Sequence, residues 1–286
     1  ARHKCHQSYI GALGTPAIDD VFWDMAKNAD IYSLATSGHT DALEFDDGKL
    51  LLGKMSSMGD ITYDRLISVV GKEKLIALLD GADLFATVNW SMIPHMTELW
   101  NRMLSDIVPV LKDRKKKPIF FVDLADPEKR KDEEIAEAFE TIAGFRKHFF
   151  VVLGLNKKEA YDIAGSLGLF SQKSLEADLS LEEVNKALYE NMDIDCLVIH
   201  PVDRSSVMID KKFYTELGPY VKNPLLSTGA GDNFNAGFVL GLLLGLAPDE
   251  CLLTGMATSG FYVRNAKSPD YAELITFLGE WAEGLV

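Results

Sequence analysis

The chain is organised around Ser227-Thr228-Gly229-Ala230-Gly231-Asp232-Asn233-Phe234-Asn235-Ala236-Gly237, which leads directly into the apolar run 238–247. Two glycines on either side of an alanine allow a tight turn in which successive backbone N–H groups point at one spot. A helix is expected next, because Phe234, Phe238, Leu242 and Leu246 recur at intervals of four. A glycine turn that opens a helix presents unpaired N–H donors and the positive end of the helix dipole, which suits an anion such as phosphate.

Asp232 lies at the mouth of this predicted anion site. A carboxylate there would repel a bare phosphate, so it makes more chemical sense as a base that takes a proton from an incoming hydroxyl. Hydroxyl, phosphate and base together indicate phosphoryl transfer. The structural alternative is a plain loop in which Asp232 is the N-cap of the helix. The stretch matches neither common nucleotide motif, because Gly-Lys-Ser/Thr is absent and Gly237 lies six residues after Gly231.

Length and composition restrict the class of protein. With 286 residues, 47% hydrophobic and 25% charged, the chain can form one large α/β domain with a small appendage. The net charge of −14 argues against nucleic acid or an anionic membrane as the main partner. Three cysteines without CxxC spacing indicate a reducing compartment and no structural zinc. The longest apolar run has twelve residues and the N-terminal residues lack a signal-peptide core, so a cytoplasmic location is expected.

Helical and extended patterns alternate along most of the chain. Strands are expected over 9–14, 82–90, 118–124, 149–153, 196–200 and 207–210. Helices are expected over 18–27, 63–79 with a break at Gly71, 94–111, 133–145, 157–167, 178–191, 233–246, 248–264 and 271–285. Because the apolar runs of the strands are nearly continuous, the pattern predicts an α/β fold with a mostly parallel sheet covered by helices on both faces.

Residues 31–55 follow a different pattern. Short extended runs are expected over 31–35 and 41–52, and Asp46-Asp47-Gly48-Lys49 is a hairpin turn signal in this segment. They predict a small β-flap outside the main sheet, and the alternative is an ordinary surface hairpin. The expected organisation is therefore one α/β domain over 1–30 and 56–286, plus a β-lid over 31–55.

Polar residues lie at or just after the ends of three of the expected strands, namely Asn89, Asp123 and Asn156. In open α/β sheets ligands gather at the carboxyl ends of the strands, so these side chains are candidates for one site. Asn156 and Glu159 lie three residues apart at the start of a helix, on the same side. The structural alternative for this pair is a capping box, in which each side chain bonds to the other residue's backbone N–H.

Together these stretches resemble the ribokinase-like (PfkB) family of carbohydrate kinases. The stretch from Ser227 to Phe234 looks like the C-terminal signature of that family, and Asn156-Lys157-Lys158-Glu159 looks like its Asn-x-x-Glu motif, ending 73 residues before Asp232. Val122-Asp123-Leu124-Ala125-Asp126-Pro127 is similar to a strand end that these kinases often have, and the segment 38–45 falls where the family has its β-lid. The resemblance extends from about residue 10 to the C-terminus.

The resemblance implies a role for each motif. Asp232 would be the base, and the N–H groups of Gly229, Ala230 and Gly231 would stabilise charge on the transferred phosphoryl group. Asn156 and Glu159 would order Mg²⁺ and the phosphates of ATP, largely through water. Further nucleotide contacts would come from Thr228 and Arg204, although a solvated loop arginine is the alternative for the latter. The adenine would lie between the region 196–208 and the helix 248–264.

A second group of residues is expected at the sugar. These residues are Asn89, Trp90, His39, Thr40 and Asp123. An aromatic face packs on a sugar ring and an amide can read hydroxyls, which favours Asn89 and Trp90. Plain core packing is the alternative for Trp90, and exposure in a turn without a ligand is the alternative for the two lid residues.

Three departures from the family's pattern limit these expectations. The first strand of the family, its substrate-binding aspartate and its Gly-Gly motif have no counterpart here, so the chain is expected to begin inside the fold. Leu226 stands where the family usually has an aspartate that helps bind a monovalent cation. The strand expected over 196–200 leads into the segment 200–206, His-Pro-Val-Asp-Arg-Ser-Ser, where the family has a glycine-rich nucleotide loop.

The sequence therefore predicts an ATP- and Mg²⁺-dependent kinase that phosphorylates a hydroxyl of a small sugar or polyol. One alternative is a nucleoside kinase of the same fold. Another is a catalytically silent relative that binds a sugar or nucleotide. A homodimer formed through the β-lid is a further expectation, because exposed strand edges are often covered by a partner.

Overall fold

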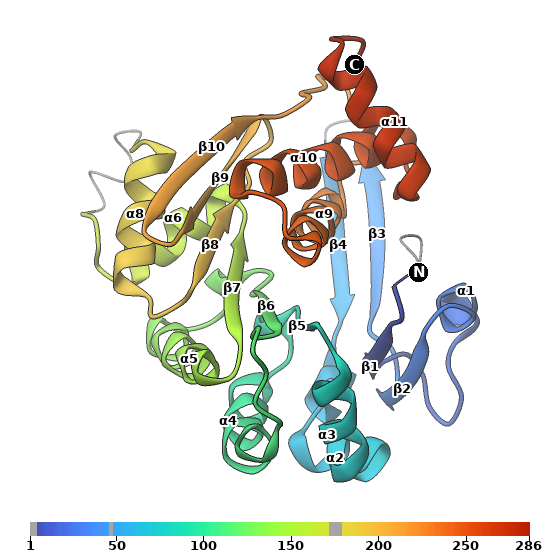
Figure 1. Ribbon diagram of the computed structural model, residues 1–286. Coiled ribbons are helices and arrows are strands. Elements are labelled where there is room, and N and C mark those ends of the chain that lie inside the picture. Colours follow the sequence, from blue (N-terminus) through green and yellow to red (C-terminus); the bar gives the residue numbers. More distant parts are fainter. Residues whose placement is uncertain (1–4, 46–47, 172–178) are drawn as a thin grey trace. The chain divides into compact units, whose positions relative to one another are not determined.

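The computed structural model describes residues 5–45, 48–171 and 179–286 (Figure 1). Contacts divide the chain into two units, which are described one at a time. Unit 1 contains residues 3–82 and 89–113, and unit 2 contains residues 83–88 and 114–286. The predicted hairpin turn at Asp46 and Asp47 lies outside the described residues.

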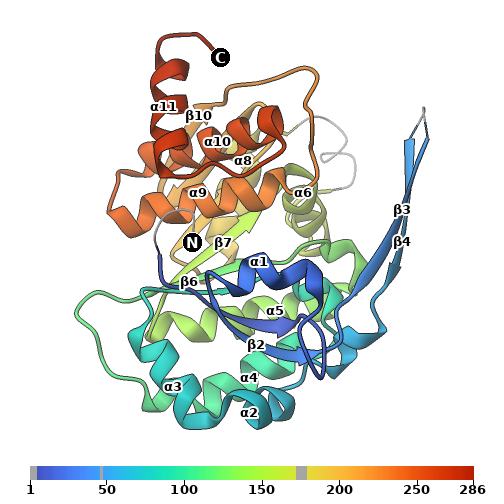
Figure 2. The same ribbon diagram turned by 90° about the vertical axis from the view of Figure 1, so that its right-hand side faces the viewer.

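Unit 1 contains two pairs of strands. β1 (Ser8–Ala12) and β2 (Asp30–Ala35) pair in parallel, while β3 (His39–Phe45) and β4 (Gly48–Lys54) form an antiparallel ribbon (Figure 2). The run 31–35, which we grouped with the flap, pairs with β1 instead of with the ribbon. The helix expected over 18–27 is short, consisting of a 3₁₀ turn (Asp20–Phe22) and α1 (Trp23–Ala26).

Three longer helices complete unit 1. They are α2 (Tyr63–Val70), α3 (Lys72–Gly81) and α4 (Met96–Asp106). Gly71 separates α2 from α3 with a φ of 83°, a left-handed value that glycine adopts without a steric penalty, so the predicted break is confirmed. Trp100 and Ile107 are fully buried and belong to the apolar core of this unit.

Unit 2 is built on a six-stranded sheet in the order β10-β9-β8-β7-β6-β5. The strands are β5 (Leu84–Thr87), β6 (Ile119–Asp123), β7 (Phe150–Leu155), β8 (Cys196–Ile199), β9 (Arg204–Ile209) and β10 (Lys212–Leu217). β5 to β8 are parallel, and β9 and β10 extend the sheet in antiparallel fashion, so the prediction of a mostly parallel sheet is confirmed. We missed β10, because the turn before it has positive φ at Asp210 and Lys211 and contains no glycine to signal a hairpin.

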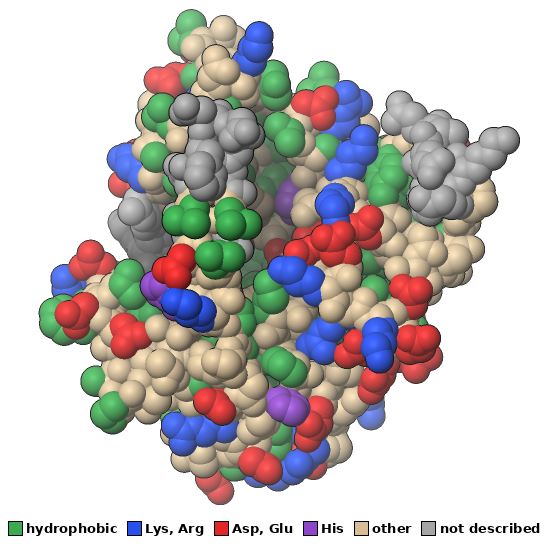
Figure 3. All heavy atoms as spheres, turned by 180° about the vertical axis from the view of Figure 1, so that it is seen from behind, with side chains coloured by type: hydrophobic (Ala, Val, Ile, Leu, Met, Phe, Trp, Pro, Cys, Tyr) green, Lys and Arg blue, Asp and Glu red, His purple; other side chains and the backbone are tan. Residues whose placement is uncertain are grey.

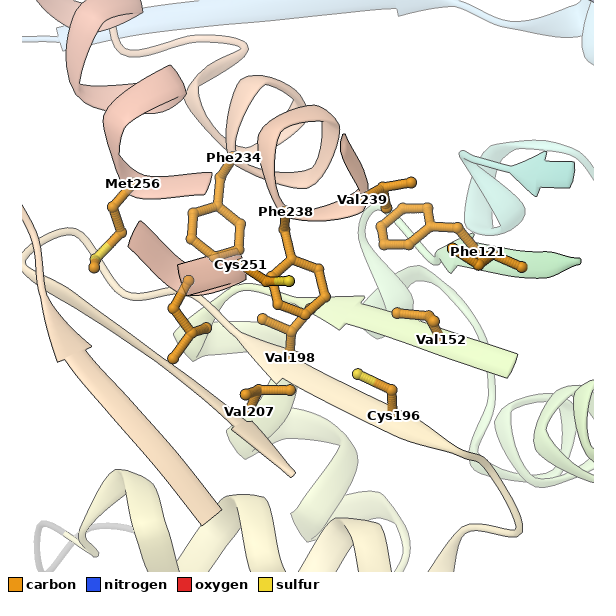
Figure 4. Close-up of a cluster of buried hydrophobic side chains, with 12 residues drawn as sticks. Phe121, Val152, Cys196, Val198, Val207, Phe234, Phe238, Val239, Cys251 and Met256 are labelled. Atoms are coloured by element: carbon orange, nitrogen blue, oxygen red, sulfur yellow. The ribbon is translucent and has the colours of Figure 1, made fainter. Parts of the chain in front are cut away.

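Helices cover both faces of this sheet. They are α5 (Asp132–Gly144), α6 (Lys157–Ser166), α8 (Leu181–Asn191), α9 (Ala230–Leu244), α10 (Pro248–Asn265) and α11 (Tyr271–Ala282). α6 and α8 contact β7, β8 and β9, while α9 packs closely on α10, which contacts β9 and β10. Phe234 and Phe238 of α9 point into a buried cluster with Val198 of β8 and Cys251 of α10 (Figure 4). Leu246, predicted on the same stripe, lies beyond the end of α9 and is 37% exposed.

On the face in Figure 3, Lys and Arg side chains are interspersed with Asp and Glu side chains. Among the described helices, none combines the length and apolar character needed to cross a membrane.

Candidate active site

The glycine turn before α9 leaves backbone donors available. Gly229 has a φ of 89° and precedes the helix without a side-chain cap. Its carbonyl accepts hydrogen bonds from the backbone N–H of Asn233 at 3.1 Å and from Nδ2 of Asn233 at 2.9 Å. Within the described part of the chain, the N–H groups of Gly231 and Asp232 have no acceptor. Two donors of the first helical turn are therefore free to bind an anion.

Asp232 lies in this first turn and is exposed on one side. Its side chain caps no backbone N–H, so the capping alternative is not what the structure contains. The protein atoms that partly surround the carboxylate raise its pKa above the usual value for aspartate. A raised pKa makes a carboxylate a stronger proton acceptor, as a general base requires.

His200 forms the wall behind the turn. It follows β8, and its imidazole stacks on Phe234 with ring centroids 4.7 Å apart. A side chain at Gly231 would place its Cβ 3.2 Å from Cε1 of His200, so the glycine allows the ring to lie close to the helix start. Burial lowers the pKa of His200 to about 4, which leaves the ring neutral at neutral pH. We treated this histidine only as a departure from the family pattern; its place directly after a buried strand was the available signal.

The predicted pair Asn156 and Glu159 forms a capping box. The backbone N–H of Glu159 donates to Oδ1 of Asn156, and the N–H of Asn156 donates to Oε2 of Glu159, both at 2.9 Å. The structural alternative is thus present, but it uses only one carboxylate oxygen of Glu159. Burial raises the pKa of Glu159 to about 8, and the nearby carboxylates of Asp123 and Asp126 add to the effect.

Asp123 ends β6 and is held by two hydrogen bonds. Its Oδ1 accepts from the backbone N–H of Ala125 and its Oδ2 accepts from Nδ2 of Asn235, both at 2.7 Å. Burial raises the pKa of Asp123 and repulsion from Asp232 raises it further, whereas these hydrogen bonds lower it. Sequence reasoning missed Asn235, although a polar residue one turn after Asp232 in an apolar helix was a usable signal.

The other two predicted nucleotide residues have partners within unit 2. The guanidinium of Arg204 pairs with the neighbouring Asp203 at 2.9 and 3.2 Å, and both side chains are about half exposed. This arrangement fits the alternative of a solvated arginine. The carbonyl of Thr228 accepts a hydrogen bond from the hydroxyl of Tyr262 at 2.7 Å, which ties the glycine turn to α10.

Four of the predicted sugar contacts lie in unit 1. Asn89 has a left-handed φ of 67°. Trp90 is 1% exposed and its Nε1 donates to Oγ1 of Thr97 at 2.9 Å, which matches the alternative of core packing. His39 and Thr40 are exposed on β3, and Nε2 of His39 lies 2.6 Å from Oδ1 of Asp41. A sugar contact by any of the four stays a prediction.

The carboxylates of unit 2 suit a hydrated divalent cation better than a metal held directly by a cage of side chains. Among the described residues, no three His, Cys, Asp or Glu side chains are placed to ligate one ion. Glu159 and Asp123 repel each other in a partly buried site, and a cation between them would relieve this repulsion. Mg²⁺ usually keeps several waters and takes few protein ligands, so these residues fit it.

The chain is similar to known proteins over nearly its whole length. A family model described as prokaryotic ketohexokinase matches residues 3–281. A ketohexokinase of Haloferax volcanii is 28% identical over 268 residues, which cover 94% of this chain and 69% of the relative.

Solved structures of similar fold include a ribokinase of Arabidopsis thaliana complexed with ribose and ATP, with a TM-score of 0.71, 13% identity, and coverage of 97% of this chain and 83% of that one. Another is a putative ribokinase II of E. coli in complex with ATP and Mg²⁺, with a TM-score of 0.68, 13% identity, and coverage of 98% and 85%. The fold is therefore ribokinase-like.

Proposed function

Because the chain belongs to the prokaryotic ketohexokinase family, we propose that the sugar it phosphorylates is a ketohexose and that Asp232 is the base of the reaction. The chain is an ATP-dependent sugar kinase, a phosphotransferase that acts on a sugar hydroxyl. The observation that carries the assignment of the base is the first turn of α9. There, the carboxylate of Asp232 caps no backbone N–H and lies in the same turn as two N–H groups that have no acceptor among the described residues.

Asp232 takes the proton from the attacking hydroxyl in this proposal. Its pKa is raised by partial burial, so the carboxylate is a better proton acceptor than a fully exposed aspartate. The neutral ring of His200 adds no positive charge that would pair with the carboxylate and weaken it as a base.

The N–H groups at the start of α9 stabilise the charge that develops on the transferred phosphoryl group. Gly229, Ala230 and Gly231 form the predicted turn. The N–H of Ala230 already donates to the carbonyl of Ser227 at 3.1 Å, whereas the N–H groups of Gly229, Gly231 and Asp232 have no acceptor among the described residues. We therefore assign the anion contacts to these last three residues. Donors fixed in a helix need no reorganisation during the reaction, which is the main source of this kind of catalysis.

At the start of α6, Asn156 and Glu159 would hold the hydrated cation and the phosphates of ATP. When bound, Mg²⁺ neutralises charge on the phosphates of ATP and helps to align them. The capping box fixes the direction of the Glu159 side chain through its Oε2, and Glu159 would help to hold the hydrated cation. Thr228, whose carbonyl is bound by Tyr262, and Arg204, which pairs with Asp203, complete the proposed nucleotide contacts.

The ribbon of β3 and β4 is proposed as the lid and as a dimer interface. Leu43 lies opposite Leu50, and Leu52 lies opposite Asp41, so the three leucines share one face. They are 46–50% exposed, and a two-stranded ribbon is marginally stable without cover. A second copy of the chain would bury this face. A monomeric mass by light scattering would contradict this part of the proposal.

We also place the enzyme in the cytoplasm, where ATP is available. None of its three cysteines, all within the described residues, forms a disulfide, which supports a reducing compartment. Oxidised, disulfide-linked protein recovered from the native source would argue against this location.

The experiment measures ADP release with Mg²⁺ and ATP against ketohexoses, aldohexoses, pentoses, polyols and nucleosides. We expect one ketohexose to be the best acceptor. Asp232→Asn should fold normally and should lower the turnover of that ketohexose by at least about 100-fold, which is the usual effect of losing a general base. A nucleoside as the best acceptor would favour the nucleoside kinase alternative. ATP binding without turnover on any acceptor would favour a silent relative. Turnover that survives in Asp232→Asn would show that the base is another residue.

A further inference from the structure

Asn235 connects the helix that carries the base to the edge of the sheet. It lies three residues after Asp232 in α9, so the two side chains project from neighbouring positions on the helix. Its Nδ2 donates to Oδ2 of Asp123 at 2.7 Å, across 112 residues of sequence. The side chain is 94% buried, as the residue is 6% exposed. This is a direct bond between the α9 helix and the carboxyl end of β6.

The sheet leaves a space for this amide. Gly154 of β7 lies opposite Asp123 in the sheet register. A Cβ at Gly154 would lie 2.9 Å from Oδ1 of Asn235 and 2.8 Å from the ring of Phe121, so only glycine leaves the room that Asn235 occupies. The amide therefore lies against β7 and reaches past it to β6.

Packing alone does not explain an asparagine at this place. Oδ1 of Asn235 is buried and has no hydrogen-bond partner among the described residues. A buried polar atom without a partner destabilises the folded state, and a leucine of similar size would avoid that cost. What the asparagine adds is the N–H that it donates to Asp123.

Asp123 is close enough to the other two acidic residues of the site for the charges to act on each other. The charge of Asp232 raises the pKa of Asp123, and the charge of Asp123 raises the pKa of Glu159. Both of its oxygens accept hydrogen bonds, one from Ala125 and one from Asn235, so its orientation is fixed. A fixed Asp123 carboxylate near Glu159 suits binding of the cation. The sequence prediction placed Asp123 at the sugar instead.

We propose that Asn235 is a positioning residue, which fixes the orientation of the Asp123 carboxylate so that Asp123 and Glu159 together face the hydrated cation of the nucleotide. This inference rests on the proposed function. Hydrogen bonds to the side chains around a metal commonly determine metal affinity, and their loss costs about 10–100-fold.

The test compares Asn235→Leu and Asn235→Ala with Asn185→Ala in the whole chain. Asn185 is a matched control, because it is fully buried, its Nδ2 donates to Oγ of Ser206 at 2.9 Å, and its Oδ1 has no partner among the described residues. Asn185 lies in α8 and takes no part in the proposed site. Asn235→Leu keeps the volume of the side chain, so it is the variant to use if the alanine variant does not fold.

Binding of Mn²⁺ in the presence of ADP, followed by the loss of the free Mn²⁺ signal in electron paramagnetic resonance, gives a measurement that needs no turnover. We expect both Asn235 variants to weaken this binding by about 10-fold or more. In sugar kinetics we expect kcat to fall while KM for the sugar changes less than about twofold, because Asp123 faces the phosphate side. Asn185→Ala should lose stability but bind Mn²⁺ as the unmodified protein does.

Unchanged Mn²⁺ binding in Asn235→Leu would overturn the inference, as would an equal loss in Asn185→Ala or a wild type that binds no Mn²⁺ with ADP. A wild type that binds Mn²⁺ with ADP but phosphorylates no sugar would refute the proposed function instead. In that case the ratio of Mn²⁺ affinities between wild type and Asn235→Leu would still decide whether Asn235 positions Asp123.

Discussion

Helices α6 and α9 of unit 2 both begin near Asp123, but their N-termini are built in opposite ways. At α6, Asn156 and Glu159 satisfy each other's backbone N–H groups. At α9, the N-cap is Gly229, which has no side chain, and two N–H groups of the first turn have no acceptor among the described residues. A capped terminus stabilises its own helix, whereas an uncapped terminus keeps donors for a ligand. In the proposed mechanism, the capped start of α6 orients the cation and the uncapped start of α9 binds the transferred phosphate.

The largest effect is expected from a substitution at the uncapped N-terminus of α9. Gly229→Ala would force alanine into a left-handed conformation and place its Cβ 2.9 Å from the hydroxyl of Tyr262. We expect a loss of about 1–2 kcal/mol in stability and at least about 100-fold in turnover, because the anion donors would move.

Gly245→Ala is the control for this variant. Gly245 ends the same helix with a φ of 75° and has open space around it, so the backbone penalty is similar. It should lose about 1 kcal/mol in stability and retain full turnover. Equal losses of turnover in the two variants would mean that the Gly229 turn has no special role in catalysis.

A smaller effect is expected from Glu159 in the absence of metal and nucleotide. Its pKa is raised from the usual 4.5 to about 8 in the folded state, mainly by burial. The folded protein therefore binds a proton that the unfolded chain releases between these values, and stability falls as pH rises from about 4.5 to 8. Glu159→Gln removes this contribution. Its stability in urea relative to wild type should rise by about 1–3 kcal/mol between pH 5 and pH 8.5, and a pH-independent difference would contradict the buried position of the carboxylate.

The smallest effect concerns the capping box itself. Asn156→Ala and Asp270→Ala each remove the N-cap side chain of a capping box, at α6 and at α11 respectively. Both should lose about 1 kcal/mol in stability. Only Asn156→Ala should also raise KM for Mg²⁺-ATP, by about fivefold, since a lost hydrogen bond is worth about 1 kcal/mol. Identical kinetics in the two variants would show that Asn156 is only a cap.

Much of the fold was predictable because it depends on local patterns. Apolar runs of strand length and helical spacing located most elements of unit 2, and the break at Gly71 followed from the conformational freedom of glycine. The turn at Asp210 and Lys211 was missed because both residues have positive φ without the glycine that usually marks such a hairpin turn. The pairing of the run 31–35 with β1 was also missed, because a short strand does not identify its partner.

The sequence by itself determined the chemistry available to this protein. The turn from Gly229 to Gly231, the carboxylate of Asp232 and the pair Asn156 and Glu159 are contiguous motifs, whose local geometry follows from the residues themselves. Only the tertiary structure decided which of these groups act on each other. The stack of His200 on Phe234 and the bond from Asn235 to Asp123 join residues 34 and 112 positions apart, and their existence depends on how α9 packs on the sheet. Burial raises the pKa of Glu159 for the same reason, because desolvation depends on neighbours that no local pattern identifies.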